Sequence, residues 1–376
     1  MIGSASTRGI NFFTNSLGNS PISSNQSLPE NMNYRDVEEV YDSLRKNFDG
    51  ELTLEDLQTG MKRGLVEAAG DPYTTYFTVE ESEEFNGEVN GTFSGIGAEL
   101  VRENGVILVT TPLSGFPAEK AGIKARDVII KIDDEDSTGI TVSEAVKRIR
   151  GEKGTTVKLT IYREDKQLEF SIVRDTITIP SVTSEVKDGV GILTITRFGD
   201  DTAELARAAA STFIAEDVRG VVVDLRNNPG GFLNQAVDVA SIWAPKGSKI
   251  VEEKRDGKTI KIDKSVGTPI LGSKPTVVLI NGGSASASEI LAGALKDLGL
   301  AKLVGEKSFG KGSVQQIDSL STGSALKVTV ATWFTPLGVN INKDGIQPDV
   351  EVKQSEEDIA NKVDTQLNEA IKNLSE

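Results

Sequence analysis

The chain has 376 residues, which is long enough for two or three domains with an ample core. Hydrophobic residues make up 38% and charged residues 26%, as in ordinary globular proteins, and 41 basic against 56 acidic residues give a formal net charge of −15. With this acidic balance and no basic cluster, we expect no nucleic-acid binding. No apolar run reaches the roughly 18 to 20 residues that a membrane span needs.

The sequence contains no histidine and no cysteine. A Ser-His-Asp triad, a Cys-His dyad, a histidine-ligated zinc site and disulfide bonds are therefore all excluded. A hydrolase of this composition has to activate its nucleophile with lysine, a carboxylate or an N-terminal amine.

Residues 1–33 are predicted to be a flexible tail, because they are polar and lack periodicity. Residues 1–15 have neither a basic n-region nor a long apolar core, so no signal peptide is visible. Two interpretations remain open: a cytoplasmic protein, or a chain that begins after a removed leader. The polar stretch 15–33 favours the second.

Residues 34–90 form a predicted helical region. Apolar residues recur with helical spacing in two segments, at Val37, Val40, Tyr41 and Leu44 and then at Leu54, Leu57, Met61 and Leu65. Such a pair of helices is either a packing domain or a dimerisation arm, and we expect packing within the chain.

Residues 91–176 form a predicted β-rich module with a helix at 141–150 and a strand at 156–162. The segments 114–122 (SGFPAEKAG) and 127–132 (DVIIKI) resemble a PDZ domain. In that family a Gly-rich loop donates backbone N–H groups to the C-terminal carboxylate of a peptide, which pairs with a sheet edge. The residues that match this loop are Gly95, Ile96 and Gly97. Arg126 stands where PDZ modules often have glycine, so the turn there is expected to differ.

Residues 177–355 alternate between apolar strands and amphipathic helices, which predicts an α/β core with a sheet buried on both faces. The expected strands are 190–196, 220–225, 276–280, 302–305 and 325–334; the expected helices are 202–215, 234–240 and about 288–298. Residues 248–264 are expected to form a hairpin. Residues 356–376 are expected to form one C-terminal amphipathic helix.

Three serines, Ser284, Ser286 and Ser288, lie where a strand turns into a helix. A helix N-terminus offers N–H groups that can stabilise an oxyanion, so each serine is a candidate nucleophile. The ordinary interpretation makes Ser288 the helix N-cap. Lys311 lies between two glycines after a strand, which is unusual for a surface lysine. A lysine acts as a general base only where its surroundings keep it neutral. If this short stretch is helical, Gln315 can hold the amine in position.

The segments 281–290 (NGGSASASEI) and 308–315 (SFGKGSVQ) resemble the C-terminal processing peptidases, or tail-specific proteases. Further matches are 70–74 (GDPYT), 224–231 (DLRNNPGG), 335–338 (TPLG) and 345–349 (GIQPD). The resemblance implies a multidomain α/β protein in which N-terminal helices and a PDZ module precede a crotonase-like α/β catalytic core. It also implies an extracytoplasmic endopeptidase of the bacterial periplasm or cell surface, with a Ser-Lys dyad and no metal or organic cofactor.

The resemblance assigns the nucleophile to Ser286, the general base to Lys311 and the residue that orients the base to Gln315. The oxyanion hole is implied to consist of the N–H of Ala287 with that of Gly230 or Gly231, of which we prefer Gly231. The pair Trp333-Phe334 stands where the family often has a tyrosine before Thr-Pro, a change that we expect to alter packing only.

The expected partners are proteins or peptides with apolar C-termini, and a homodimer through the N- or C-terminal helices is also considered. Arg150 is a candidate regulatory residue that contacts the catalytic core, although a solvated cation at a helix end is an equal alternative. Two rival functions remain: a catalytically silent PDZ scaffold that binds protein C-termini, and an acyl-CoA enzyme of the crotonase type. A covalent serine adduct would distinguish the peptidase from both.

Overall fold

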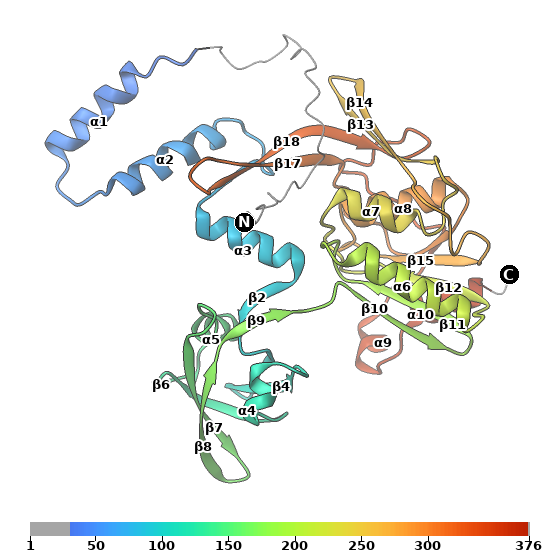
Figure 1. The fold of residues 1–376 in the computed structure, drawn as a ribbon, viewed down its shortest axis with the longest axis horizontal. Coiled ribbons are helices and arrows are strands. Elements are labelled where there is room, and N and C mark those ends of the chain that lie inside the picture. Colours follow the sequence, from blue (N-terminus) through green and yellow to red (C-terminus); the bar gives the residue numbers. More distant parts are fainter. Residues whose placement is uncertain (1–30, 375–376) are drawn as a thin grey trace, which may run out of the picture. The chain divides into compact units, whose positions relative to one another are not determined.

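The computed structural model describes residues 31–374, so the predicted tail at 1–33 falls almost entirely outside the described part of the chain (Figure 1). The chain divides into two compact units. One contains the described residues up to Val79 together with Gln315–Val330; the other contains Glu80–Val314 and the residues from Ala331 onward.

The first unit carries the two predicted helices, α1 (Arg35–Asn47) and α2 (Leu54–Glu67). Helix α2 begins with a capping box, because the Thr53 hydroxyl accepts the Asp56 N–H while the Asp56 carboxylate accepts the Thr53 N–H. Neither helix has a buried residue. Lys62 of α2 nevertheless donates to the Tyr76 hydroxyl at 3.0 Å, so α2 contacts the rest of its unit, and the expected packing of both helices within the chain stays a prediction.

The rest of this unit is β-structure. Strand β1 (Thr75–Phe77) pairs antiparallel with the first part of β18 (Ala325–Phe334), where Thr75 lies opposite Lys327. Strand β17 (Ser313–Ser319) also pairs with β18. The short β1 thereby fixes the GDPYT segment beside β18.

The second unit begins with α3 (Val79–Asn90) and the β-rich module. Five strands of the module form an antiparallel sheet in the order β3-β4-β5-β7-β8, with β6 beside β5, and β2 pairs with β9. The bounds are β2 Thr92–Gly95, β3 Ala98–Glu103, β4 Val106–Pro112, α4 Pro117–Ala121, β5 Val128–Ile132, β6 Glu135–Asp136, α5 Val142–Ile149, β7 Thr156–Arg163, β8 Lys166–Val173 and β9 Asp175–Thr178. Its core is aliphatic, with Ile107, Ile129, Leu159 and Ile161 almost fully buried.

Arg126 keeps the turn that a glycine would make, since its φ is 69°. The expectation that this turn differs from the glycine form is therefore wrong. The neighbouring Asp127 is buried and accepts two hydrogen bonds from Arg163, at 2.6 and 2.7 Å, which hold the turn against β7.

The α/β core is a six-stranded sheet in the order β10-β11-β12-β15-β16-β19, in which only β10 is antiparallel. The bounds are β10 Val182–Lys187, β11 Val190–Ile195, β12 Gly220–Asp224, β15 Thr276–Ile280, β16 Lys302–Gly305 and β19 Val350–Glu351. Every residue of β15 is buried, as expected for a strand covered on both faces.

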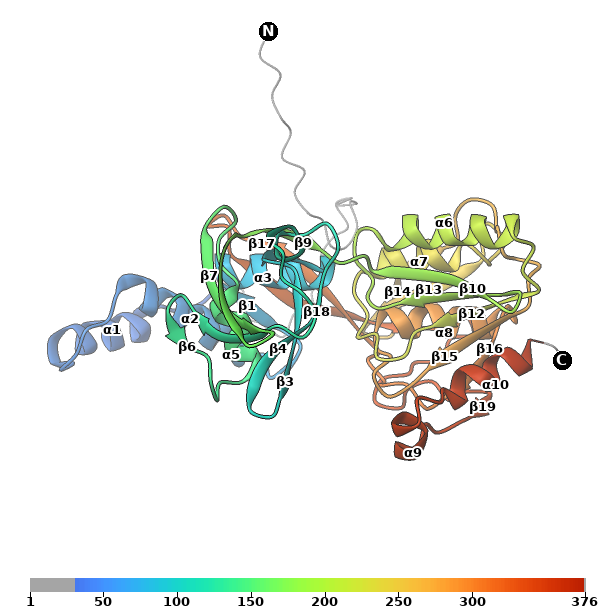
Figure 2. The ribbon, with the colours of Figure 1, turned by 90° about the horizontal axis from the view of Figure 1, so that it is seen from below.

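Helices cover both faces of this sheet. They are α6 (Thr202–Ala215), α7 (Leu233–Ala240), α8 (Ala287–Asp297) and α10 (Thr365–Asn373), while the short α9 (Glu356–Ala360) precedes α10 and has no residue described as buried. Phe213 of α6 packs against Gly191 on one face, while Ala370 and Leu374 pack with Val190 and Val222 on the other. Figure 2 shows α6 and α10 on opposite sides of the strands.

The hairpin predicted at 248–264 is confirmed as β13 (Lys249–Arg255) and β14 (Lys258–Lys264), and β13 pairs with the last part of β18. The single C-terminal helix expected at 356–376 is wrong. It is interrupted because Lys362 has a φ of 57° and Asp364 then caps α10 by accepting the Leu367 N–H.

Candidate active site

Three loops leave the carboxyl ends of the adjacent parallel strands β12, β15 and β16. In an open α/β sheet, this edge is where sites are usually built. The first loop contains Asn227–Gly231, the second ends at Ser286, and the third contains Lys311. A hydrogen bond of 3.0 Å from the Phe309 N–H to the Ser284 carbonyl joins the second and third loops.

Ser286 is the N-cap of α8, not Ser288 as the sequence analysis assumed. The hydroxyl of Ser288 donates to the Asn228 carbonyl at 2.9 Å, and that of Ser284 donates to the Leu225 carbonyl at 2.7 Å. Both of these serines are fully buried, whereas Ser286 is partly exposed. Of the three candidate nucleophiles, Ser286 is therefore the one that solvent and substrate can reach.

The backbone of Ser286 is in a rare conformation, with φ 55° and ψ −114°. Such positive-φ geometry in a residue with a side chain costs about 1–3 kcal/mol and is found mostly at functional sites. A nucleophilic serine on a strained strand-to-helix turn is a recurring arrangement in hydrolases.

Glu289 joins the loop that ends at Ser286 (the serine loop) to the loop that contains Lys311 (the lysine loop). It was not among the site residues predicted from the sequence. Its side chain is 1% exposed. One oxygen, Oε2, accepts the N–H groups of Ser286 at 2.8 Å and Lys311 at 2.9 Å. The other, Oε1, accepts the Ser308 hydroxyl at 2.6 Å and the Gly310 N–H at 2.7 Å. The sequence carried one signal, an acidic residue in the first turn of α8, which has an ordinary explanation in helix electrostatics.

The backbone of Lys311 is held through both its N–H and its carbonyl. Its N–H donates to Glu289, and its carbonyl accepts the indole N–H of Trp333 at 2.9 Å. Trp333 is 1% exposed, and its backbone N–H donates to the Gly312 carbonyl. The expectation that Trp333 affects packing only is therefore wrong, because the indole fixes the lysine backbone directly.

Gln315 lies in strand β17, so the assumption of a short helix after Lys311 is wrong. Gly310 has a φ of 94°, which is outside the helical region, and the chain enters the strand at Ser313. The Gln315 side chain is buried, and its Nε2 donates to the Thr329 hydroxyl at 3.4 Å.

Gly230 passes directly against the loop that ends at Ser286. With φ +103°, a Cβ added there would lie 2.9 Å from the Ser286 Cβ and 3.0 Å from the Ala287 nitrogen, so only glycine fits. The Gly230 N–H donates to the Asn228 side chain at 2.8 Å and is thus already engaged. The bridge with Phe198 uses the Gly230 carbonyl and the Phe232 N–H, but not the Gly231 N–H. Ala287 is the first residue of α8, so its N–H has no acceptor within the helix.

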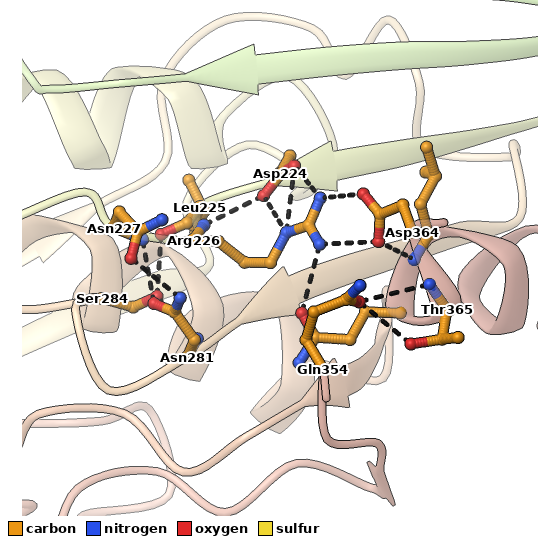
Figure 3. A network of polar contacts seen from close by, with 11 residues as sticks. Asp224, Leu225, Arg226, Asn227, Asn281, Ser284, Gln354, Asp364 and Thr365 are labelled. Carbon is orange, nitrogen blue, oxygen red and sulfur yellow. Dashed lines mark hydrogen bonds and ion pairs between the residues drawn. The ribbon is translucent and has the colours of Figure 1, made fainter. Parts of the chain in front are cut away.

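The loop after β12 is fastened to α10 by Arg226 (Figure 3). The guanidinium contacts both Asp224, at 2.6 Å, and Asp364, at 2.8 Å, and it also donates to Gln366. Burial alone would lower the pKa of Arg226, but its hydrogen bonds with the two carboxylates raise it above the ordinary value. On the other side of the loop, Asn227 and Asn281 exchange two hydrogen bonds of 2.9 Å.

The β-rich module carries a groove between the start of β3 and helix α5. Gly95, Ile96 and Gly97 line it together with Val146 and Ile149, as the PDZ resemblance predicts. Gly97 has φ +71°, and a Cβ there would lie 2.5 Å from the Phe116 Cβ, so the loop requires glycine. Arg150 also lines the groove, with its guanidinium 4.5 Å from the centre of the Phe93 ring.

The comparisons with known proteins agree with this geometry. The profile of Peptidase family S41 matches residues 189–352, and that of the PDZ domain matches residues 94–173. The carboxy-terminal processing protease CtpA of Bacillus subtilis (strain 168) is 39% identical over 322 residues, which cover 84% of this chain and 68% of that protein. The chain belongs to peptidase family S41.

Two further similarities support this assignment. A probable CtpA-like serine protease of Staphylococcus epidermidis (strain ATCC 12228 / FDA PCI 1200) is 40% identical over 322 residues, 85% of this chain. The S41 chain spans only 65% of the length of that relative. The solved structure of the photosystem II D1 C-terminal processing protease matches with a TM-score of 0.52 and 30% identity, covering 84% of this chain and 86% of that one. The predicted family and the mixed α/β fold with a PDZ module are therefore confirmed.

Proposed function

We propose that this S41 chain is a serine endopeptidase that recognises protein C-termini through its PDZ module and cleaves peptide bonds with Ser286 and Lys311. The observation that carries the proposal is the shared carboxylate of Glu289, whose Oε2 binds the backbone N–H of both residues. Ser286 is in addition the accessible serine of its cluster and is held in a strained conformation.

The proposed mechanism uses only groups of the chain. The neutral amine of Lys311, oriented by Gln315, accepts the hydroxyl proton of Ser286 as Oγ attacks the substrate carbonyl. The N–H groups of Ala287 and Gly231 stabilise the oxyanion; Gly231 is preferred to Gly230 because the Gly230 N–H is bound to Asn228. Lys311 then protonates the departing amine. Water hydrolyses the acyl-enzyme by the same route, which restores the Ser286 hydroxyl.

The substrates proposed for this site are unfolded or flexible chains with apolar C-termini, because Ile96, Val146 and Ile149 make the PDZ groove largely apolar. We also propose an extracytoplasmic location, in the bacterial periplasm or at the cell surface. Among residues 31–374, no helix is long and apolar enough to cross a membrane. The regulatory role of Arg150 stays a prediction.

The first test is mass spectrometry of an unfolded protein with an apolar C-terminus after incubation with the wild type, Ser286→Ala or Lys311→Ala. We expect cleavage by the wild type alone, together with a covalent adduct of a serine-reactive phosphonate on Ser286. Cleavage that survives Ser286→Ala would contradict the assignment. Tight binding of the tail without cleavage would favour the silent scaffold, and neither binding nor cleavage would reopen the acyl-CoA alternative.

The apolar faces of α1 and α2 are the basis for a proposed homodimer. Val40, Leu54 and Leu65 are 57% to 67% exposed in the single chain, and a groove between the helices is lined by Tyr41, Leu44 and Phe48. Soluble monomers rarely leave such contiguous apolar surface uncovered. We expect light scattering to give a dimer for the wild type and a monomer for Val40→Asp/Leu44→Asp. A wild type that remains a monomer at about 100 μM would contradict the dimer, because a dissociation constant above that concentration means only weak association.

A further inference from the structure

The GDPYT segment at residues 70–74 has no role in the mechanism above, yet it carries a carboxylate inside a closed polar cluster. Asp71 Oδ2 accepts two hydroxyl hydrogen bonds of 2.6 Å, one from Thr74 and one from Thr329 of β18. Its other oxygen accepts the Tyr73 N–H at 3.3 Å. The Thr74 hydroxyl in turn accepts the Thr329 N–H at 3.2 Å. Asp71, Thr74 and Thr329 therefore lock each other in position.

The cluster reaches one residue of the proposed catalytic machinery. The Thr329 hydroxyl, which donates to Asp71, also accepts the Nε2 group of Gln315 at 3.4 Å. Gln315 is 8% exposed, and all four residues lie in the same compact unit. A continuous path thus runs from the Gln315 amide through one hydroxyl to one carboxylate.

The charge of Asp71 decides which group donates and which accepts in each hydrogen bond of this path. Burial opposes the ionised form, but the hydrogen bonds from Thr329 and Thr74 outweigh it and lower the pKa of Asp71 below its ordinary value. An ionised carboxylate can only accept hydrogen bonds, so the Thr329 hydroxyl has to be the donor in its hydrogen bond with Asp71. Because its hydrogen is used in this bond, the Thr329 hydroxyl can only accept from Gln315. The end of the Gln315 amide that faces Thr329 therefore has to be the NH₂ group. The amide oxygen of Gln315 is thereby directed away from Thr329.

We propose that Asp71 and Thr329 are positioning residues of the peptidase that fix the orientation of the Gln315 amide. The inference rests on the proposed function, in which Gln315 orients the amine of Lys311. An amide oxygen is the end that can accept from an ammonium or amine N–H, whereas an NH₂ group cannot. A Gln315 side chain that is free to rotate would present either end, and the base would lose its orientation during proton transfer.

The test measures kcat and KM for cleavage of an unfolded protein with an apolar C-terminus. Thr329→Val removes the hydroxyl at nearly constant volume, and Thr329→Ser restores it. We expect kcat of Thr329→Val to fall by about 10- to 100-fold, because misplaced catalytic groups cost that much. We expect KM to change by less than about twofold, since substrate binding is untouched. Thr329→Ser is expected to keep most of the wild-type kcat.

Thr332→Val is the matched control, since Thr332 lies on the same strand but is exposed and donates to the Lys254 carbonyl. A double-mutant cycle separates positioning from stability. In a Gln315→Ala background, Thr329→Val is expected to cause no further loss of kcat. Melting temperatures are recorded for every variant. If Thr329→Val does not fold, Asp71→Asn takes its place in the double-mutant cycle with Gln315→Ala, and kcat is measured in the same way.

Two outcomes would overturn the inference while leaving the proposed function intact. The first is an active Thr329→Val variant with wild-type kcat, in a protein that Ser286→Ala inactivates. The second is an additive loss of kcat in the double mutant, which would show that Thr329 does not act through Gln315. Cleavage that persists in Ser286→Ala would overturn the proposed function and, with it, this inference.

Discussion

Glu289 is the residue on which the serine and lysine loops depend. It accepts one hydroxyl and three backbone N–H groups, and it is buried. A buried carboxylate is costly unless its oxygens are fully hydrogen-bonded, so the two loops and the carboxylate stabilise each other. The strained φ of Ser286 persists because its N–H is tied to Glu289 while its carbonyl accepts the Ile290 N–H.

Replacing Glu289 with glutamine tests this dependence. The variant keeps the shape but turns one acceptor into a donor, so at least one of the four donors loses its partner. We expect a loss of about 1–3 kcal/mol in the free energy of unfolding and a fall in kcat of about tenfold or more from the displaced Ser286 and Lys311. Urea unfolding and steady-state cleavage measure the two effects. Glu216→Gln, an exposed change at the end of α6, is the control; wild-type kcat in Glu289→Gln would contradict the coupling.

At the scale of elements, the loop between β16 and β17 is irregular but firmly held. Lys343 donates its N–H to the Gly310 carbonyl, and the Asn342 side chain accepts the Gly312 N–H at 3.2 Å. Trp333 of β18 donates to the Lys311 carbonyl from the opposite side. Lys311, the proposed base, is therefore presented by a preorganised loop, which reduces the ordering that the transition state requires.

Trp333→Phe removes the indole N–H while retaining an aromatic ring. The Lys311 carbonyl then loses a donor, for which we expect a cost of about 1 kcal/mol in stability. We expect kcat to fall several-fold with KM unchanged, because the change acts on Lys311, the proposed base, and not on the PDZ groove. Thermal unfolding and initial rates check this. A larger effect on KM than on kcat would show that Trp333 contributes to substrate binding instead.

Most core elements were predictable because their patterns are local. The buried β15 was predicted with its correct bounds, as was α6, since a strand covered on both faces and an amphipathic helix are visible in a short window. The start of α8 was not, because Ser286 and Ser288 are equally good caps locally. What decides between them is the Asn228 carbonyl, 60 residues away, which binds the Ser288 hydroxyl.

The site was predictable only in part for the same reason. The motifs indicated Ser286, Lys311 and Gln315 through a family resemblance, and the structure shows how their backbones are held. Glu289 and Trp333 act through contacts that span about 20 residues of chain, to Lys311. No periodicity or spacing rule reports such contacts. The break between α9 and α10 was missed because nothing local marks the positive φ at Lys362.

At the scale of the whole core, the C-terminal helix supports the loop that carries Gly230 and Gly231. Helix α10 covers one face of the sheet through Ala370 and Leu374, and Asp364 at its N-cap binds Arg226 at the start of the loop. Burial alone would raise the pKa of Asp364, but the hydrogen bonds from Arg226 and from the Leu367 N–H hold it below the ordinary value of 3.8.

Asp364→Asn should therefore change how stability depends on pH. A depressed pKa in the folded state adds stability above the unfolded value near 3.8, and that stability is lost as pH falls through the lower folded value. We expect the variant to melt below the wild type at pH 7, and the difference to shrink as pH falls from about 5 to 3. Asp256→Asn, in the exposed β13–β14 turn, is expected to show no such convergence. Cleavage at pH 7 should also fall in Asp364→Asn, since Arg226 loses a charged partner. A constant difference in melting temperature across this range would show that the ion pair does not fasten α10 to the loop that carries Gly230 and Gly231.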